Sequence, residues 1–446
     1  REHQRARCSH YLFLNNWDAL ILSLYLSRMH FKKILTILLS ISLFILSSFV
    51  FPNYASASPI KILYLAQLQN SVKSMTPEAV LEKLFTSEDI KAEWFAVEFL
   101  AQVAINQIKT IIFGVKNQLG TYQGVEKDGN DYVVNFSQGS VPTKIALNNR
   151  GQIIGLLLQP GLKFSSLSEA IAEFKKLPGK VSFLVKEDSS IIADFNAKTT
   201  SPVGSAFKLA VLKTLKQQIA SGQKSWSDIV ILKTEDQSLP SGILQTWPDN
   251  SPLTLQTLAN LMISLSDNTA TDILIKQVGR ESIESNSSKN NIPFLTTREL
   301  FSLKSSQNRK LLERYRKSDL KQRREILAEL ANQTLPDVNE FIETNPNALD
   351  IEWFYNAEEL CELILYVADL PLMSINPGIA NPKDWQRVAY KGGSEPGVLN
   401  FTTWLKGKNG KQYCVVATWN NSDAPVDEGK FAALYGGVIS FLAAQI

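Results

Sequence analysis

The stretch that decides the fold runs from residue 202 to residue 209 and reads Pro202-Val203-Gly204-Ser205-Ala206-Phe207-Lys208-Leu209. An apolar run with helical spacing follows it at residues 209–219. Ser205 and Lys208 are three positions apart, so a helix that begins here places both side chains on one face, one turn apart. The start of a helix also offers free backbone N–H groups and a positive potential beside the serine.

A serine nucleophile in this region needs a base other than histidine. His3, His10 and His30 all lie near the N-terminus, which excludes a Ser-His-Asp triad and argues against a histidine-ligated zinc site. The sequence contains no Cys-x-x-Cys, and we expect no metal and no cofactor. A lysine can act as the base when burial or a nearby positive charge lowers its pKa, so Lys208 is the predicted base.

The Ser-x-x-Lys spacing alone is not specific. Two further matches begin at Ser221 and Ser318, and both lie in polar, charged stretches typical of the surface. Two other motifs follow in the chain and raise the specificity. Ser266-Asp267-Asn268 comes after an apolar helical run at residues 255–265, and Lys391-Gly392-Gly393-Ser394 ends a predicted strand that begins near residue 387.

These three motifs, in this order, resemble the signature of class A β-lactamases and penicillin-binding proteins. The resemblance covers about residues 165–446. It implies an α+β, β-lactamase/transpeptidase-like domain whose antiparallel sheet is built from both chain ends and packs on a helical region. It also implies that Ser205 attacks a carbonyl carbon, that Lys208 accepts or relays its proton, and that Ser266 passes a proton toward the leaving nitrogen.

The same resemblance assigns substrate binding to Asn268, Lys391, Gly393 and Ser394. Asn268 would hydrogen-bond the substrate amide, and Lys391 would attract a substrate carboxylate. The backbone N–H groups of Ser205 and Ser394 would form the oxyanion hole. Gly392 stands where the family has Thr or Ser, which removes one expected contact to the carboxylate.

The base for deacylation is not recognisable. Class A β-lactamases carry a Glu-x-x-Leu-Asn loop between the second and third motifs, and its glutamate activates the attacking water. No such motif lies between Asn268 and Lys391. Glu299 and Glu352 are the nearest candidates, and each is interpreted as a surface or capping carboxylate. Residues 305–332 are predicted to form an inserted charged helix with a solvated face, a contact with an acidic wall polymer being the alternative.

The beginning of the chain has the pattern of a secretory signal over residues 29–57. Met29 and two lysines precede an apolar run at residues 34–50, and Ala55-Ser56-Ala57 matches a cleavage site. Residues 1–28 would then be translated from upstream of the true start. The protein is expected to be exported to the periplasm or the extracellular space. An uncleaved membrane anchor is the alternative.

Residues 71–160 are predicted to form a small α+β accessory domain before the hydrolase domain at residues 163–446. Helical periodicity over residues 71–118 begins at Thr76-Pro77-Glu78, and a strand meander follows. The pattern resembles the cone-shaped, nuclear-transport-factor-like domains that precede some secreted hydrolases. We assign no chemistry to this domain.

Composition adds little about partners. The formal net charge of +3 on 446 residues does not favour a nucleic-acid partner. Cys361 and Cys414 are interpreted as two separate buried residues, with a disulfide as the alternative. The expected partner is a small-molecule β-lactam or a peptidoglycan peptide, with an association to the envelope or wall.

Three functions are considered. The first is a β-lactamase-like hydrolase acting through a Ser205 acyl-enzyme. The second is a D,D-peptidase, esterase or penicillin-binding protein that does not turn over, which the missing glutamate loop favours. The third is a pseudoenzyme, and the intact Ser205, Lys208, Ser266, Asn268 and Lys391 argue against it.

Overall fold

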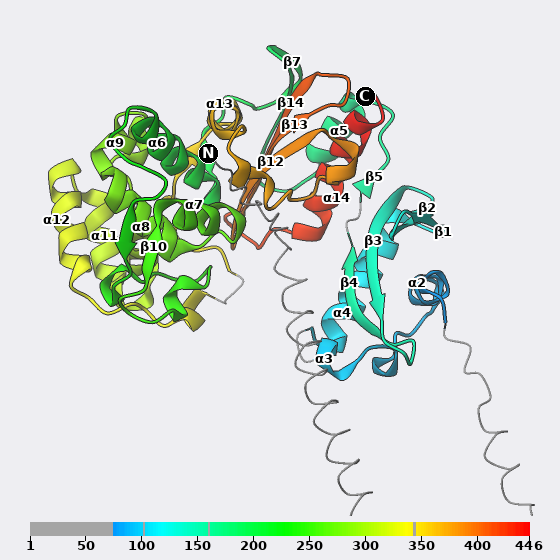
Figure 1. Cartoon of the computed structure of the whole chain (residues 1–446). Helices are drawn as coiled ribbons and strands as arrows, with labels where there is room; N and C mark the ends of the chain where they lie inside the picture. Colours follow the sequence, from blue (N-terminus) through cyan, green and yellow to red (C-terminus); the bar gives the residue numbers. More distant parts are fainter. Residues whose placement is uncertain (1–74, 101–102, 159–160, 342–344) are drawn as a thin grey trace, which may run out of the picture. The chain divides into compact units, whose positions relative to one another are not determined.

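The computed structural model describes residues 75–446 except residues 101–102, 159–160 and 342–344 (Figure 1). The predicted secretory signal and the extension before it lie outside the described residues. Within the described part, no helix has both the length and the apolar character needed to cross a membrane.

The sheet of the C-terminal region is antiparallel and has five strands in the order β12-β13-β14-β6-β7. The strands are β6 (Lys180–Glu187), β7 (Ser190–Phe195), β12 (Arg387–Glu395), β13 (Val398–Lys406) and β14 (Gln412–Asn420). β14 pairs with β6, which joins the two ends of the region in one sheet (Figure 1). This confirms the predicted sheet built from both chain ends.

Both faces of this sheet are buried, and the alternation along β14 shows how. Tyr413, Val415 and Ala417 point into a core shared with α5 (Leu167–Phe174) and α14 (Glu428–Ala443). Cys414 and Val416 point the other way, into the core of the helical region. Successive side chains of a strand point to opposite faces of the sheet, so alternate residues of β14 lie in two different cores.

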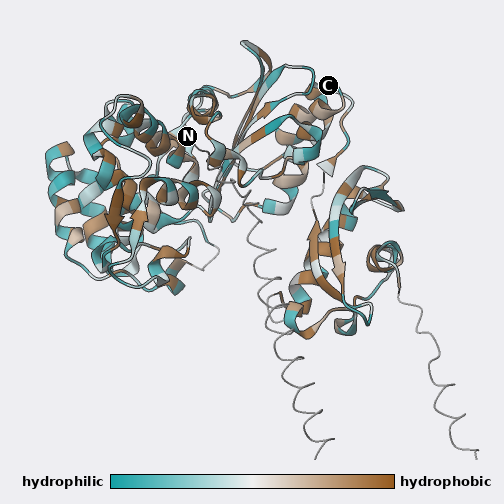
Figure 2. Cartoon of the chain, viewed as in Figure 1, coloured by the Kyte–Doolittle hydropathy of each residue, from teal (hydrophilic) through white to brown (hydrophobic). Residues whose placement is uncertain are grey.

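The helical region lies between β7 and β12 in sequence. Its helices are α6 (Lys208–Ala220), α7 (Leu255–Ser264), α8 (Asn268–Val278), α9 (Arg280–Glu284), α10 (Thr297–Lys304), α11 (Arg309–Lys317), α12 (Leu320–Ala331) and α13 (Ala357–Val367). Two short antiparallel pairs join β9 (Ile229–Ile231) to β10 (Pro252–Thr254) and β8 (Ser201–Pro202) to β11 (Phe354–Tyr355). Brown and teal segments along these helices show that most are amphipathic (Figure 2).

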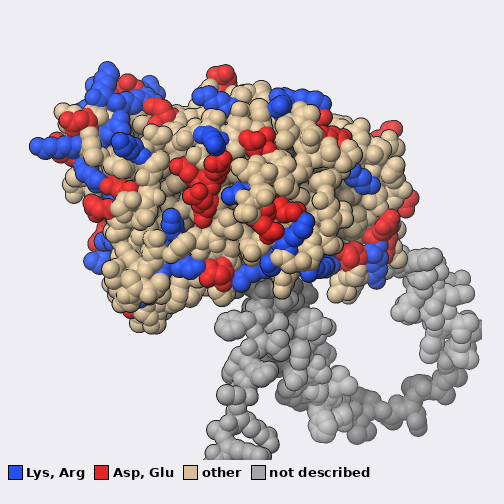
Figure 3. Space-filling view, turned by 90° about the horizontal axis from the view of Figure 1, so that it is seen from above, with Lys and Arg blue, Asp and Glu red and all other residues tan. Residues whose placement is uncertain are grey.

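The charged segment at residues 305–332 forms two helices, so the prediction of a single helix is wrong. The break falls at Ser318, and Asp319 begins α12 with a capping box to Gln322. Leu312 and Tyr315 of α11 are buried, so the insertion packs on the domain with one face. Basic and acidic side chains are mixed on the end of the molecule that holds α11 and α12 (Figure 3).

Cys361 on α13 and Cys414 on β14 form a disulfide, with Cα atoms 6.0 Å apart. The expectation of two separate buried cysteines is wrong. Helix α13 packs on the sheet face from which the Cys414 side chain points, which brings the two thiols together.

The described residues between 77 and 162 form helices followed by a strand meander. The helices are α2 (Pro77–Thr86), α3 (Val97–Leu100) and α4 (Ile105–Leu119), and the strands are β1 (Tyr122–Asp128), β2 (Asp131–Phe136), β3 (Gly139–Leu147), β4 (Ile153–Leu158) and β5 (Gly161–Leu162). Thr76 caps α2 as its side chain accepts from the Ala79 N–H at 3.3 Å. The unit has its own apolar core, which includes Leu81, Phe85 and Phe136. The resemblance to cone-shaped accessory domains stays a prediction.

Candidate active site

Ser205 lies in a single 3-10 turn, Gly204–Phe207, that leads directly into α6. Gly204 has φ +50°, a left-handed conformation that favours glycine. Backbone N–H groups in the first turn of a helix lack intrahelical partners, so the Ser205 amide is available to a ligand. The Ser205 hydroxyl makes no hydrogen bond with any residue that the structure describes.

Lys208 is fully buried beneath this turn and makes three hydrogen bonds. Its Nζ donates to the Ser266 carbonyl at 2.6 Å, to Ser266 Oγ at 3.0 Å and to Asn268 Oδ1 at 2.6 Å. Burial, and secondarily the positive charge of Lys391, hold the pKa of Lys208 well below its usual value. A lysine with a lowered pKa can be neutral near neutral pH, which is what a general base requires.

Ser266 Oγ lies between two lysines. It accepts from Lys208 and from Lys391, each at 3.0 Å. Lys391 is also buried and donates to the Gly392 carbonyl at 2.7 Å, and burial lowers the pKa of Lys391 to about 7. Since Ser266 can give its own proton onward and take another from either lysine, this arrangement can carry a proton.

The turn that presents Ser266 is fixed by its two neighbours. Ser266 has φ +54°, and Asp267 caps α8 by accepting from the Ala270 N–H at 2.8 Å. The Asp267 carboxylate also accepts from the backbone N–H groups of Ile243 and Leu244. Asp267 therefore holds the loop, while Asn268 turns its amide oxygen to Lys208.

Strand β12 passes so close to the Ser205 turn that only glycine fits at position 393. A Cβ on Gly393 would lie 2.1 Å from the Val203 carbonyl oxygen and 2.5 Å from the Ser205 amide nitrogen. On the other side, a Cβ on Gly204 would lie 3.1 Å from the Ser394 amide nitrogen. The amides of Ser205 and Ser394 thus come together at the junction of strand and turn, as an oxyanion hole requires.

The space above Gly392, where the family has Thr or Ser, is occupied. A Cβ there would lie 2.2 Å from the Tyr390 hydroxyl oxygen. Tyr390 is two residues earlier on the same strand and so points to the same face. The Tyr390 ring packs beside Phe401 and does not line the cavity above Ser205.

The two candidate deacylation carboxylates have other partners. Glu299 forms a capping box with Thr296 and an ion pair with Arg280 at 2.6 Å, which confirms its interpretation as a capping carboxylate. That interpretation is wrong for Glu352. Its side chain is fully buried and pairs with Lys304, and Lys304 also contacts Glu395 at 2.7 Å.

The Lys304, Glu352 and Glu395 cluster was not found from the sequence, because its members are up to 91 positions apart. Burial and the nearby Glu395 hold the pKa of Glu352 well above its usual value, and one oxygen of its carboxylate has no hydrogen-bond partner among the described residues. Glu395 directly follows Ser394, so the cluster anchors the strand end that carries one oxyanion amide.

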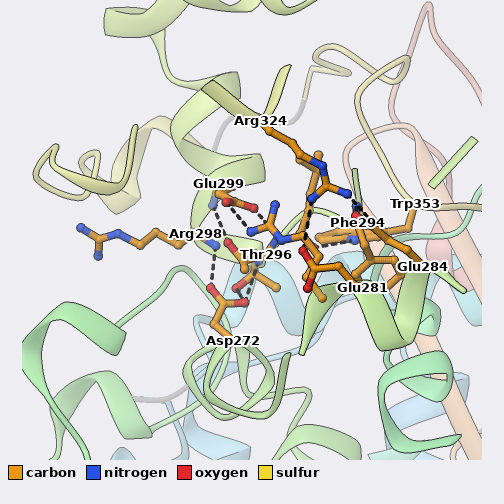
Figure 4. A network of polar contacts seen from close by, with 12 residues as sticks. Asp272, Glu281, Glu284, Phe294, Thr296, Arg298, Glu299, Arg324 and Trp353 are labelled. Atoms are coloured by element: carbon orange, nitrogen blue, oxygen red, sulfur yellow. Dashed lines mark hydrogen bonds and ion pairs between the residues drawn. The ribbon is translucent and has the colours of Figure 1, made fainter. Parts of the chain in front are cut away.

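Helices α8 and α10 are held together by a buried polar network (Figure 4). Asp272 accepts from the Thr297 N–H at 2.7 Å, from the Thr297 hydroxyl at 2.9 Å and from the Arg298 N–H at 2.8 Å. Burial raises the pKa of Asp272 to about 6. Since Asn268 lies one turn before Asp272, this network fixes the second motif against the wall of the site.

A cavity of about 700 Å³ opens above Ser205. Ser205, Ser241, Asn268 and Ser394 line one end of the cavity. Residues of α10 and α11, residues 340–341 and residues 345–347 contribute to the rest of its wall. The volume lies within the range of cavities that bind small organic ligands. Among the described residues, no group of three His, Cys, Asp or Glu side chains could hold a metal ion.

Residues 165–336 match the model of a family described as the β-lactamase enzyme family. The matched part contains Ser205, Lys208, Ser266 and Asn268 and ends before Lys391. No curated protein matches the chain.

Several solved structures are similar to the chain. They include the β-lactamase from Sphaerobacter thermophilus (19% identity, 63% of this chain and 97% of that chain, TM-score 0.43). The β-lactamase from Francisella tularensis has 17% identity over 63% of this chain and 99% of its own, with a TM-score of 0.43. PBP-A has 14% identity over 65% of this chain and 99% of its own, with a TM-score of 0.44.

The five-stranded sheet and the helical region form one α+β domain, in which Ser205 lies beside the buried Lys208, Ser266 and Lys391. Residues 165–336, which include Ser205, Lys208, Ser266 and Asn268, are therefore similar to the β-lactamase enzyme family.

Proposed function

We propose that the protein is an envelope serine hydrolase that reacts with a β-lactam, or a related amide or ester, through an acyl-enzyme on Ser205. The observation that carries the proposal is the buried Lys208, which donates to Ser266 while Ser266 also accepts from Lys391. Two lysines with lowered pKa around one hydroxyl would be costly in a purely structural role.

The reaction would proceed in two transfers. Ser205 Oγ attacks the carbonyl carbon, and its proton passes to neutral Lys208 as the new C–O bond forms. The developing oxyanion accepts from the amides of Ser205 and Ser394. As the C–N bond breaks, Ser266 donates its proton to the leaving nitrogen and is reprotonated from Lys208.

The test of the site is mass spectrometry of the protein mixed with a penicillin. We expect an adduct with the mass of the intact penicillin, and we expect Ser205→Ala to abolish it. Ser221→Ala and Ser318→Ala are matched controls, because each removes the serine of another Ser-x-x-Lys, and both should keep the adduct. An adduct that survives Ser205→Ala would overturn the assignment.

Within this proposal, we infer that acylation is faster than deacylation. The capping role of Glu299 and the ion-paired burial of Glu352 favour this, because neither carboxylate lines the cavity above Ser205. Losing a positioned general base slows a reaction by about a hundredfold to ten-thousandfold. A D,D-peptidase, an esterase or a penicillin-binding protein that does not turn over is then the second candidate function.

Pre-steady-state kinetics with a chromogenic cephalosporin separates these functions. A burst equal to the enzyme concentration followed by a slow phase supports slow deacylation. Fast linear turnover without a burst contradicts it and identifies an efficient β-lactamase, whose base would then be sought by Glu→Gln exchange at Glu299, Glu340 and Glu352.

We also propose that the protein is exported, with a mature form that begins near Ser58. The Ala55-Ser56-Ala57 pattern after an apolar run supports this. N-terminal sequencing of the secreted form tests it, and a mature protein that retains residues 34–50 would indicate a membrane anchor instead.

A further inference from the structure

The cavity above Ser205 has a second wall that the reaction itself does not use. Arg309, Leu312, Glu313 and Arg316 line the cavity and follow one another at i, i+3, i+4 and i+7. These spacings place all four side chains on one face of α11. One face of α11 therefore lines the same cavity as Ser205.

Three apolar side chains also line the cavity. Phe301 of α10 and Phe341 pack edge to face, with ring centroids 4.9 Å apart, and both line the cavity together with Leu312. An apolar lining of this kind takes the hydrocarbon part of a ligand because contact removes both surfaces from water.

Nearly every charge along the cavity has a partner. Arg316 donates to both carboxylate oxygens of Asp350 at 2.7 Å and also binds Glu313. The Glu340 carboxylate accepts from the Ser306 N–H at 2.8 Å and from the Ser305 hydroxyl. Lys304 and Glu395 bind each other.

Arg309 is the exception. Of the charged residues that line the cavity, it alone has no ion pair or side-chain hydrogen bond to any part of the chain that the structure describes. Its guanidinium is exposed at the first turn of α11 and offers several N–H donors. The chemical complement of this group is a carboxylate, which a guanidinium can bind through two parallel hydrogen bonds.

We propose that α11 forms an extended subsite for the acyl side arm of the substrate, and that the arm is an aliphatic chain ending in a carboxylate. The carbonyl lies at Ser205, the chain runs past Phe301 and Leu312, and the terminal carboxylate binds Arg309. This proposal rests on the proposed acylation of Ser205 and names the class of acyl group that the site prefers.

Three penicillins that differ only at the end of a six-carbon acyl arm test the subsite. They carry hexanoyl, adipoyl and 6-aminohexanoyl arms, which end in a methyl group, a carboxylate and an amine. The measured quantity is the second-order rate constant for acylation of the full chain, followed by mass spectrometry. We expect the adipoyl compound to react about fivefold to tenfold faster than the hexanoyl compound, a preference that falls as salt is added.

Arg309→Gln should remove the preference for adipoyl and leave the hexanoyl rate unchanged. Lys310→Gln is the matched control, because Lys310 is an exposed cation on the same turn that does not line the cavity. Arg309→Glu should reverse the preference in favour of the 6-aminohexanoyl compound.

The outcomes distinguish this proposal from the one that it rests on. No adduct with any of the three compounds would refute acylation of Ser205 itself. Adducts at equal rates for hexanoyl and adipoyl, or an equal loss of preference in Lys310→Gln, would refute the subsite and leave the acylation site intact.

Discussion

Replacing Gly393 by alanine would test whether the oxyanion hole lies where strand β12 meets the Ser205 turn. The added Cβ would lie 2.5 Å from the Ser205 amide nitrogen, whereas ordinary contact begins at 3.4 Å. The strand and the turn would therefore have to separate by about 1 Å, which carries the Ser205 and Ser394 amides apart. A misplacement of this size, or the loss of one oxyanion donor, slows a reaction by about a hundredfold or more.

The assay is the acylation rate with a reporter β-lactam, measured beside the free energy of unfolding. Gly393→Ala should acylate about a hundredfold more slowly, and its overpacking should cost about 1–3 kcal/mol of stability. Gly410→Ala is the control for stability alone. Gly410 has φ +87° in the β13–β14 turn and open space around an added Cβ, so the change should destabilise the protein and leave acylation unaltered. A folded Gly393→Ala with the wild-type acylation rate would refute this placement of the oxyanion hole.

Three other changes have defined outcomes. Lys304→Met leaves the buried carboxylate of Glu352 without its cation and should lower the free energy of unfolding by about 3–5 kcal/mol; chemical denaturation measures this, and a loss below about 1 kcal/mol would speak against the buried pair. Burial lowers the pKa of Lys391 to about 7 from 10.5, so the unfolded chain binds more protons between these pH values and stability should rise with pH through this window. Lys391→Met should flatten that rise in unfolding curves taken at successive pH values, and an equally steep rise in the variant would contradict the assignment. Gly392→Thr should lower the free energy of unfolding by about 1–3 kcal/mol, because its Cβ would lie 2.2 Å from the Tyr390 hydroxyl oxygen, and adding Tyr390→Phe should reduce this cost in chemical denaturation.

Local patterns predicted most of the sheet. The alternation of side chains from Gln412 to Trp419 predicted β14 to within one residue. The helix predicted from Asp427 is α14, and Asp427 is its N-cap. The one long helix expected at residues 305–332 is interrupted at Ser318 and Asp319. The residues of the Asp319–Gln322 capping box are present in the sequence, but the continuous charge pattern favoured a single helix.

The features that could not be predicted from the sequence depend on contacts between segments that are distant in the chain. The pairing of Cys361 with Cys414 depends on α13 packing over β14, and no spacing rule connects two such elements. The burial of Glu352 also depends on a distant segment, because its ion-pair partner Lys304 lies on α10. In the candidate site, the sequence motifs identified Lys208, Ser266 and Lys391. The close approach of Gly393 to the Ser205 turn could be recognised only from the structure.

The Cys361–Cys414 bond closes residues 361–414 into a covalent ring. The ring spans 53 positions and contains Lys391, Gly393 and Ser394, while Ser205, Lys208 and Ser266 lie outside it. The disulfide therefore constrains the segment that carries the third motif and leaves the first two motifs outside the ring. Preparations made in a reducing host and in an oxidising one are chemically different molecules, and kinetic constants measured on the two should be compared only after the thiols have been counted.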